Sequence, residues 1–333
     1  MTTIRDVAAR AGVSVATVSR VLNGSGYVGK DTEIRVKKAI QELNYRPNTV
    51  ARSLANRKTG TIAVILPDIM NPFFSELARA VEDTARDGGF TVIFCNSDDL
   101  GTREQHYIEV LRQKYIDGII FASNSMGEDD IVYMNENRIP IVVLDRAPGK
   151  SGCTVIRSQN AAGAVMAVRH LMETGCRKIA HIAGPGELIT AQERLRGYRK
   201  AVKGFTWFDE SLIVPGHFSI RGGERAVSGL LERHPDVDGI FAGNDLMAIG
   251  ALKALQRMGR KIPRDISLCG FDGVEMSEWT EPELTTIAQP IYEMGRKAAT
   301  HLIARIRGKA VKEDILELDV RLVERNSTRR RKN

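Results

Sequence analysis

Ten polar and aromatic side chains follow short apolar runs at widely separated places in this 333-residue sequence. Aromatic rings can stack on the C–H faces of a sugar, and carboxylates, amides and guanidinium groups can exchange several hydrogen bonds with its hydroxyls. This mixture of residue types predicts a site for a neutral polyhydroxylated ligand. The candidate residues are Asn71, Phe73, Phe74, Asp145, Arg146, Arg194, Phe218, Asn244, Asp272 and Gln289.

Each candidate taken alone also has a structural explanation. Phe73 and Phe74 could belong to a hydrophobic core. Asp145 and Arg146 could form a surface ion pair, and Asp272 could cap a loop. The placement of the whole set after six or seven separate apolar runs favours one shared site, because ligands of open α/β sheets bind beyond the carboxyl ends of the strands.

Short apolar runs alternate with amphipathic helical patterns from Ile62 onward. Strands that are apolar throughout, with helices between them, predict parallel sheets covered on both faces. About ten strands are too many for one sheet of this type, so we expect two α/β subdomains side by side. The predicted strands lie within 61–68, 90–96, 118–123, 140–145, 154–158, 178–184, 239–245, 266–272, 285–290 and 316–325.

The first sixty residues have a different, helical pattern. Thr3 and Asp6 resemble a capping box, Gly12 supplies a turn, and Ser14 can cap a second helix. A third helix over 31–43 closes a small core and should place Ile34, Ala39, Ile40 and Leu43 inward. Two short helices across a glycine turn, followed by a third, are typical of a helix-turn-helix.

All of the net charge of +7 lies in these sixty residues, which carry eleven Lys and Arg against four Asp and Glu. The rest of the chain carries thirty-seven residues of each sign. The excess predicts a polyanion partner, and short outward residues on the second helix would let it enter a DNA major groove. A small helical bundle with a solvated basic face is the alternative.

The segments IRDVAARAGVSVATVSRVLNG and LNYRPNTVARSLANRKTGTIAVILPD resemble the DNA-binding headpiece and hinge of the LacI/GalR family of bacterial repressors, and the likeness extends to Arg325. It departs at Gly29, where the family usually has a Ser or Thr helix cap. The resemblance implies base contacts for Val15, Ala16 and Arg20. It implies further DNA contacts for Ser14, Thr17, Asn23, Tyr27, Ala51, Arg52 and Leu54, with Leu54 wedged into the minor groove.

The same resemblance implies a core of the type I periplasmic-binding-protein fold, in which two doubly wound parallel sheets are joined by three crossings of the chain. The implied division is a headpiece over 1–46, a hinge helix and linker over 47–60, and a basic tail over 326–333 that we expect to be frayed and solvated. The core would have an N-terminal subdomain of 61–158 and 290–318, and a C-terminal subdomain of 159–289 and 319–325.

The candidate ligand segments resemble those of ribose-binding proteins and of ribose-responsive members of the family, which implies D-ribose as the effector. Pro67 departs from that pattern, because a hydroxyl side chain stands there in ribose-binding proteins. Arg146 occupies a position that is aromatic in purine-responsive members. A purine co-repressor-dependent repressor and a phosphoprotein-sensing catabolite regulator remain as alternatives.

We therefore expect a homodimeric repressor on a near-palindromic DNA operator, released by a small sugar. Nothing in the sequence indicates an enzyme, a metal site or a cofactor. No apolar run reaches the ~20 residues of a membrane span, and the N-terminus lacks a signal-peptide pattern, so we expect a cytoplasmic protein. The widely spaced cysteines at 95, 153, 176 and 269 are expected to be buried thiols.

Overall fold

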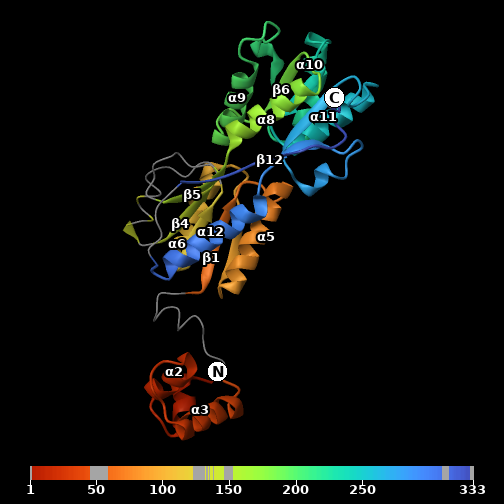
Figure 1. The fold of residues 1–333 in the computed structure, drawn as a ribbon. Helices are drawn as coiled ribbons and strands as arrows, with labels where there is room; N and C mark the ends of the chain where they lie inside the picture. The colour runs from red at the N-terminus through yellow and green to blue at the C-terminus, as the bar shows by residue number, and fades with distance from the viewer. Residues whose placement is uncertain are drawn as a thin grey trace. The chain divides into compact units, whose positions relative to one another are not determined.

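The computed structural model of the chain describes residues 2–45, 59–122, 139–145, 153–309 and 315–330, together with positions 132, 134, 136 and 137. The chain divides into two compact units, Met1–Thr59 and Gly60–Asn333, each of which Figure 1 shows as a ribbon. None of the described helices is both long enough and apolar enough to cross a membrane.

The first unit is a three-helix bundle of α1 (Ile4–Ala11), α2 (Val15–Asn23) and α3 (Lys30–Glu42). Thr3 and Asp6 form the predicted capping box. Gly12 ends α1 in the left-handed conformation that a side chain would disfavour, with a φ of 66°. Gly29 begins α3 without a side-chain cap bond. The core of the unit consists of Val7, Ala8, Ala11, Val18, Val36 and Ala39.

The prediction that Ile34 faces the core of the first unit is wrong, because its side chain is 64% exposed. Val36 and Ala39 are the buried residues of α3, and Ile40 and Leu43 pack against the same core. Because successive helical residues are about 100° apart, Ile34 lies about 200° from Val36 and points away from the core.

The second unit contains two six-stranded sheets. The first sheet is parallel, with the spatial order β11 (Ile315–Leu318), β5 (Thr154–Ser158), β4 (Ile141–Leu144), β3 (Gly118–Phe121), β1 (Thr61–Leu66) and β2 (Thr91–Asn96). The second has the order β12 (Arg321–Val323), β10 (Thr285–Ala288), β9 (Ser267–Asp272), β8 (Gly239–Ala242), β6 (Ile179–Ala183) and β7 (Ile213–Pro215). It is parallel except for the pair of β10 and β12.

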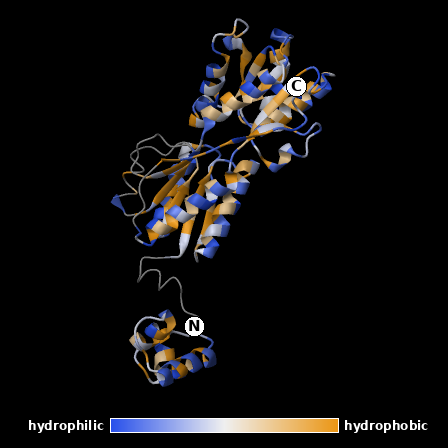
Figure 2. Cartoon of the chain, in the orientation of Figure 1, coloured by the Kyte–Doolittle hydropathy of each residue, from blue (hydrophilic) through white to orange (hydrophobic). Residues whose placement is uncertain are grey.

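Helices cover both faces of each sheet. The helices with the first sheet are α5 (Pro72–Asp87), α6 (Gly101–Gln113) and α12 (Ile291–Ile306), and those with the second are α8 (Asn160–Glu173), α9 (Ile189–Val202), α10 (Ile220–Arg233) and α11 (Asp245–Arg257). Short 3₁₀ turns span Glu210–Leu212 and Glu275–Ser277. Figure 2 shows apolar strands beneath helices with hydrophilic outer stripes. Along β1, Ile62 and Val64 join one hydrophobic core while Ala63 and Ile65 join the other, so the predicted doubly wound fold class is confirmed.

The chain passes between the two sheets three times, after β5, after β10 and after β11. The apolar run 316–325 spans two strands, β11 and β12, and the break between them follows Leu318, at the subdomain boundary that the family resemblance implies. These two strands belong to different sheets. A single continuous strand cannot pair in both sheets, so the run must break at the crossing.

The expectation of a frayed, solvated tail is wrong for residues 326–329. Ser327 and Thr328 are buried, and the Ser327 hydroxyl donates to the carbonyl of Leu268 in β9. The Arg329 guanidinium lies 3.3 Å from the Asp238 carboxylate and donates to the carbonyls of Pro263 and Asp265. This part of the tail therefore holds together the strands and turns of the second sheet.

Replacing Arg329 with alanine should lower the stability of the second unit. The change leaves two carbonyls and the Asp238 carboxylate without this donor, a loss of about 1–3 kcal/mol. Urea unfolding followed by circular dichroism should show a lower midpoint for the variant. Arg330→Ala, at an exposed neighbouring position, is the matched control, and equal midpoints for the two variants would contradict a structural role for Arg329.

Candidate functional site

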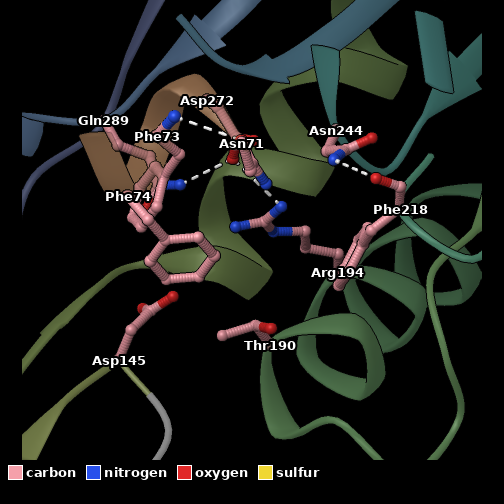
Figure 3. A pocket seen from close by; sticks show the side chains of 10 residues that line it. All are labelled: Asn71, Phe73, Phe74, Asp145, Thr190, Arg194, Phe218, Asn244, Asp272 and Gln289. Carbon is pink, nitrogen blue, oxygen red and sulfur yellow. Dashed lines mark hydrogen bonds and ion pairs between the residues drawn. The ribbon is translucent and has the colours of Figure 1, made fainter. Parts of the chain in front are cut away.

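A cavity with about 290 Å³ of empty space, part of it open solvent, lies where the strands of the two sheets end. Nine of the ten predicted ligand residues line it, and Figure 3 shows their side chains converging on one space. The lining consists of Asn71, Phe73, Phe74, Asp145, Thr190, Arg194, Phe218, Asn244, Asp272 and Gln289.

The two adjacent phenylalanines are positioned by the start of α5. Asn71 caps this helix by accepting a hydrogen bond from the Phe73 amide at 3.1 Å, and Pro72 occupies its first turn. The Phe73 and Phe74 rings meet edge to face, with centroids 5.0 Å apart. Both rings also belong to the hydrophobic core of the first sheet. They therefore pack in the core and line the cavity at the same time.

Arg194 is held rigidly in the cavity from α9, and its side chain is almost completely buried. Its Nε donates to Asn160 Oδ1 at 2.9 Å, and its Nη1 donates to the Gly243 carbonyl at 2.6 Å. Nη1 also lies 3.2 Å from Asp272 Oδ1. The guanidinium carbon sits 3.9 Å from the centre of the Phe271 ring, a cation–π distance. The donors that remain are therefore fixed in direction before any ligand arrives.

Asp272 is a buried acceptor in the cavity that two neighbouring side chains hold in place. It is 4% exposed, and its Oδ1 accepts hydrogen bonds from Gln289 Nε2 at 2.7 Å and from Arg194. Burial raises the pKa of Asp272 to about 6, although the charge of Arg194 and the Gln289 amide act in the opposite direction. Its carboxyl group can therefore serve as an ionised acceptor for hydroxyl groups near neutral pH.

Three residues lining the cavity have positive backbone φ angles, which non-glycine residues rarely adopt. The values are 57° for Asp145, 50° for Phe218 and 122° for Asp272. Such conformations persist only where the surrounding structure imposes them, and they cluster at ligand sites. This clustering is a sign of a functional site that is independent of the residue types.

The other lining residues come from two further segments. Asn244 caps α11 by accepting from the Met247 amide at 2.9 Å, and its Nδ2 donates to the Phe218 carbonyl. Thr190, which the sequence analysis missed, lies in the first turn of α9. Its spacing of four residues before Arg194 places both on one helix face, and this spacing could have identified it.

Asn160 is a second residue that the sequence analysis missed. Its side chain lies between Arg194 and Asp145, with Nδ2 3.4 Å from Asp145 Oδ1. It stands at the start of α8, directly after the first crossing of the chain. The remaining predicted ligand residue, Arg146, lies outside the described residues.

The candidate DNA contacts of the first unit lie on the exposed side of α2 and just beyond it. Val15 is 41% exposed and Ala16, Arg20 and Asn23 are also exposed, while Val18 on the opposite side is buried. Ser14 caps α2 by accepting from the Thr17 amide, and Tyr27 is 94% exposed. The hinge candidates Ala51, Arg52 and Leu54 lie outside the described residues.

The described part of the chain gives little support for a metal site or for a reactive cysteine or histidine. No group of three or more His, Cys, Asp or Glu side chains there is placed to hold a metal ion. All four cysteines are buried, as predicted. His181 stacks between Tyr198 and Phe241, and burial lowers its pKa to about 4, so it is a neutral core residue.

Comparisons with known proteins cover nearly the whole chain. Residues 3–48 match the family described as bacterial regulatory proteins, lacI family, and residues 59–325 match periplasmic binding proteins and sugar binding domain of LacI family. The chain is 44% identical to the ribose operon repressor of Halalkalibacterium halodurans, over 99% of this chain and 98% of that protein.

Two solved structures are also similar. One is a LacI family transcriptional regulator from Enterococcus faecium with bound ribose, which is 33% identical, with a TM-score of 0.74 over 81% of this chain and 98% of that one. The other is the lac repressor dimer bound to operator and the anti-inducer ONPF, 28% identical, with a TM-score of 0.87 over 99% of both chains.

Proposed function

The chain belongs to the LacI family and is a DNA-binding transcriptional repressor rather than an enzyme. From this premise we propose that D-ribose binds in the cavity and thereby releases the repressor from its operator. The observation that carries this proposal is the convergence of aromatic rings, carboxylates, amides and one fixed arginine around a small space. Aromatic faces suit the C–H surfaces of a sugar, and the polar groups suit its hydroxyls.

The charges of the described lining residues favour a neutral sugar over a phosphorylated one, whereas Arg146, which lies outside the described residues, keeps a phosphorylated pentose open as an alternative. Among the described lining residues, Asp145 and Asp272 carry carboxyl groups and Arg194 carries the single guanidinium. Arg194 already pairs with Asp272 and donates to Asn160 and Gly243. A phosphate would meet an excess of carboxyl groups there, with no uncommitted cation among these residues to balance its charge.

The similar proteins support the same ligand class. A protein 44% identical over nearly the full length is named a ribose operon repressor, and a related regulator has been solved with ribose bound. A purine co-repressor and a phosphoprotein partner are the alternative effectors. They would leave the repressor assignment unchanged, because the fold and the headpiece are common to the family.

For DNA recognition, we propose that the exposed side of α2 reads the operator. Val15, Ala16 and Arg20 would contact base edges, since short side chains allow a helix to approach the bases closely. The predicted phosphate and register contacts are Ser14, Thr17, Asn23 and Tyr27, and the predicted hinge contacts are Ala51, Arg52 and Leu54. The charge excess of the first sixty residues supports this assignment.

We also propose that the active form is a homodimer on a near-palindromic operator, with one headpiece for each half-site. The similarity to a lac repressor dimer on its operator supports this form. We also propose the division given by the sequence analysis, with a headpiece over 1–46, a hinge over 47–60 and a core of two subdomains that ends at residue 325. On this proposal the protein acts in the cytoplasm, where operator DNA is found.

Calorimetric titration of the purified protein tests the effector. We expect saturable binding of D-ribose, and no comparable heat from xylose, ribose 5-phosphate or hypoxanthine. Addition of D-ribose should then release the protein from a fluorescent operator duplex. Binding of the phosphate or the purine in place of ribose would overturn the effector assignment and leave the repressor assignment intact.

A further inference from the structure

Asp245 is a buried carboxyl group that does not line the cavity. It is 0% exposed, at the first position of α11, directly after the lining residue Asn244. Its Oδ2 accepts hydrogen bonds from the amides of Gly273 and Val274 at 2.8 and 2.9 Å. Its Oδ1 accepts from the Thr286 hydroxyl at 2.6 Å. The described residues place no cationic side chain in an ion pair with it.

The two amides that Asp245 accepts from belong to the turn that carries Asp272. The backbone φ is 122° at Asp272 and 77° at Gly273. A residue with a side chain adopts such a conformation only where its surroundings impose it. This conformation allows the Asp272 side chain to accept from Gln289 and Arg194 within the cavity. Asp245, which does not line the cavity, anchors this turn through its two amides.

The neighbouring backbone is adapted to this carboxyl group. A Cβ atom at Gly270 would lie 2.2 Å from Asp245 Oδ1, so a side chain at that position would displace the carboxyl group. The Thr286 hydroxyl on β10 satisfies the remaining oxygen. One buried side chain thus links the start of α11, the end of β9 and β10. The first two of these carry the lining residues Asn244 and Asp272.

We propose that Asp245 is a positioning residue for the effector site, which holds the 272–274 turn so that Asp272 presents its carboxyl group to the sugar. The inference rests on the proposed sugar-binding function of the same cavity. It assigns Asp245 no contact with the ligand, so its removal should weaken sugar binding through the orientation of Asp272 and should leave the operator affinity of the sugar-free protein unchanged.

Three variants test this role. Asp245→Ala removes both acceptors and should weaken D-ribose binding by about 10- to 100-fold, the effect of losing buried hydrogen bonds to a carboxyl group. Asp245→Asn can accept from the two amides and donate to the Thr286 hydroxyl, so it should restore affinity to within about threefold of the wild type. Operator affinity without sugar should be the same for both variants.

Asp238→Ala is the matched control. Asp238 also accepts from two backbone amides, those of Arg177 and Lys178 at 2.8 and 2.9 Å, but it precedes β8 and so lies at the opposite end of the sheet. Its replacement should lower stability and leave D-ribose affinity unchanged. Wild-type affinity in a folded Asp245→Ala variant, or an equal loss in Asp238→Ala, would overturn the proposal.

Hydrogen exchange of the wild-type protein provides a measurement that needs neither a folded variant nor the correct sugar. Without ligand, the Gly273 and Val274 amides should exchange at least ~100-fold more slowly than unprotected amides. Unprotected exchange of both amides would overturn the anchoring role. If these amides are protected and D-ribose does not bind the wild type, the proposed effector fails and the anchoring of the turn stands.

Discussion

Asparagine in place of Asp272 should weaken D-ribose binding by about 10- to 100-fold and impair sugar-dependent release of the operator, while operator binding itself persists. The Asp272 carboxyl group accepts from both Arg194 and Gln289. The carbonyl oxygen of an asparagine can still accept from both donors, but the neutral side chain leaves the Arg194 charge without this partner, and its amino group replaces the second carboxylate oxygen that could accept from the sugar. Each sugar hydrogen bond to the ionised carboxyl group that is lost costs about 1.5–3 kcal/mol, which is about one to two powers of ten in affinity.

Calorimetry with D-ribose and fluorescence anisotropy with an operator duplex measure the two parts of this prediction. Asp236→Asn is the control, because Asp236 also pairs with a cation, Lys178, but at an exposed position. That variant should bind D-ribose and release the operator as the wild type does. Normal release by D-ribose in the Asp272 variant would show that the proposed ligand site is wrong.

The wild type and the Asp272→Asn variant should differ in how their affinity for D-ribose depends on pH. Burial raises the pKa of Asp272 to about 6, and a sugar hydroxyl donates preferentially to the ionised form. Protonation of Asp272 opposes binding, so wild-type affinity should fall as the pH is lowered through about 6. Asp272→Asn has no carboxyl group at this position, so its weaker binding should lack this fall.

Alanine in place of Arg20 should remove most of the preference for the operator over unrelated DNA. Arg20 is exposed on α2, on the side proposed to face the bases. An arginine that bonds a guanine edge contributes about 1–3 kcal/mol of discrimination, and its loss should leave weak, salt-sensitive binding to any duplex. Anisotropy titrations with operator and scrambled duplexes at two salt concentrations measure both effects.

Lys37→Ala is the matched control for Arg20. Lys37 is an exposed cation of the same unit, but it lies on α3 and pairs with Glu33. Its removal should leave the ratio of operator to scrambled affinity unchanged. If Arg20→Ala keeps the wild-type ratio, Arg20 does not read bases.

The helices of the first unit and most strands of the second could be predicted from the sequence, because short-range rules set them. The Thr3–Asp6 capping box and the turn at Gly12 act over three or four residues. Nine of the ten ligand-site candidates line one cavity for a similarly simple reason. Parallel strands bring their carboxyl ends to one edge, so residues after several strands must meet there.

The short-range rules failed where a segment leaves the sheet to which its neighbours belong. The apolar pattern of 316–325 shows no break, and only the family resemblance implied the crossing after residue 318, where the structure divides the run between two sheets. Residues 326–329 have a solvent-exposed composition, but the structure buries Ser327 and pairs Arg329 with Asp238, ninety-one residues earlier. No local pattern reports such a distant partner.

The class of the two units, the residue types of the cavity and the concentration of positive charge in the first sixty residues can all be read from the amino-acid sequence. The contacts that hold those residues appear only in the folded chain: Arg194 pairs with Asp272, Asn160 lies between Arg194 and Asp145, and Asp245 accepts from the turn that follows Asp272. The reason is that composition and periodicity depend on neighbours along the chain, whereas these contacts join segments that meet only after the sheets have assembled.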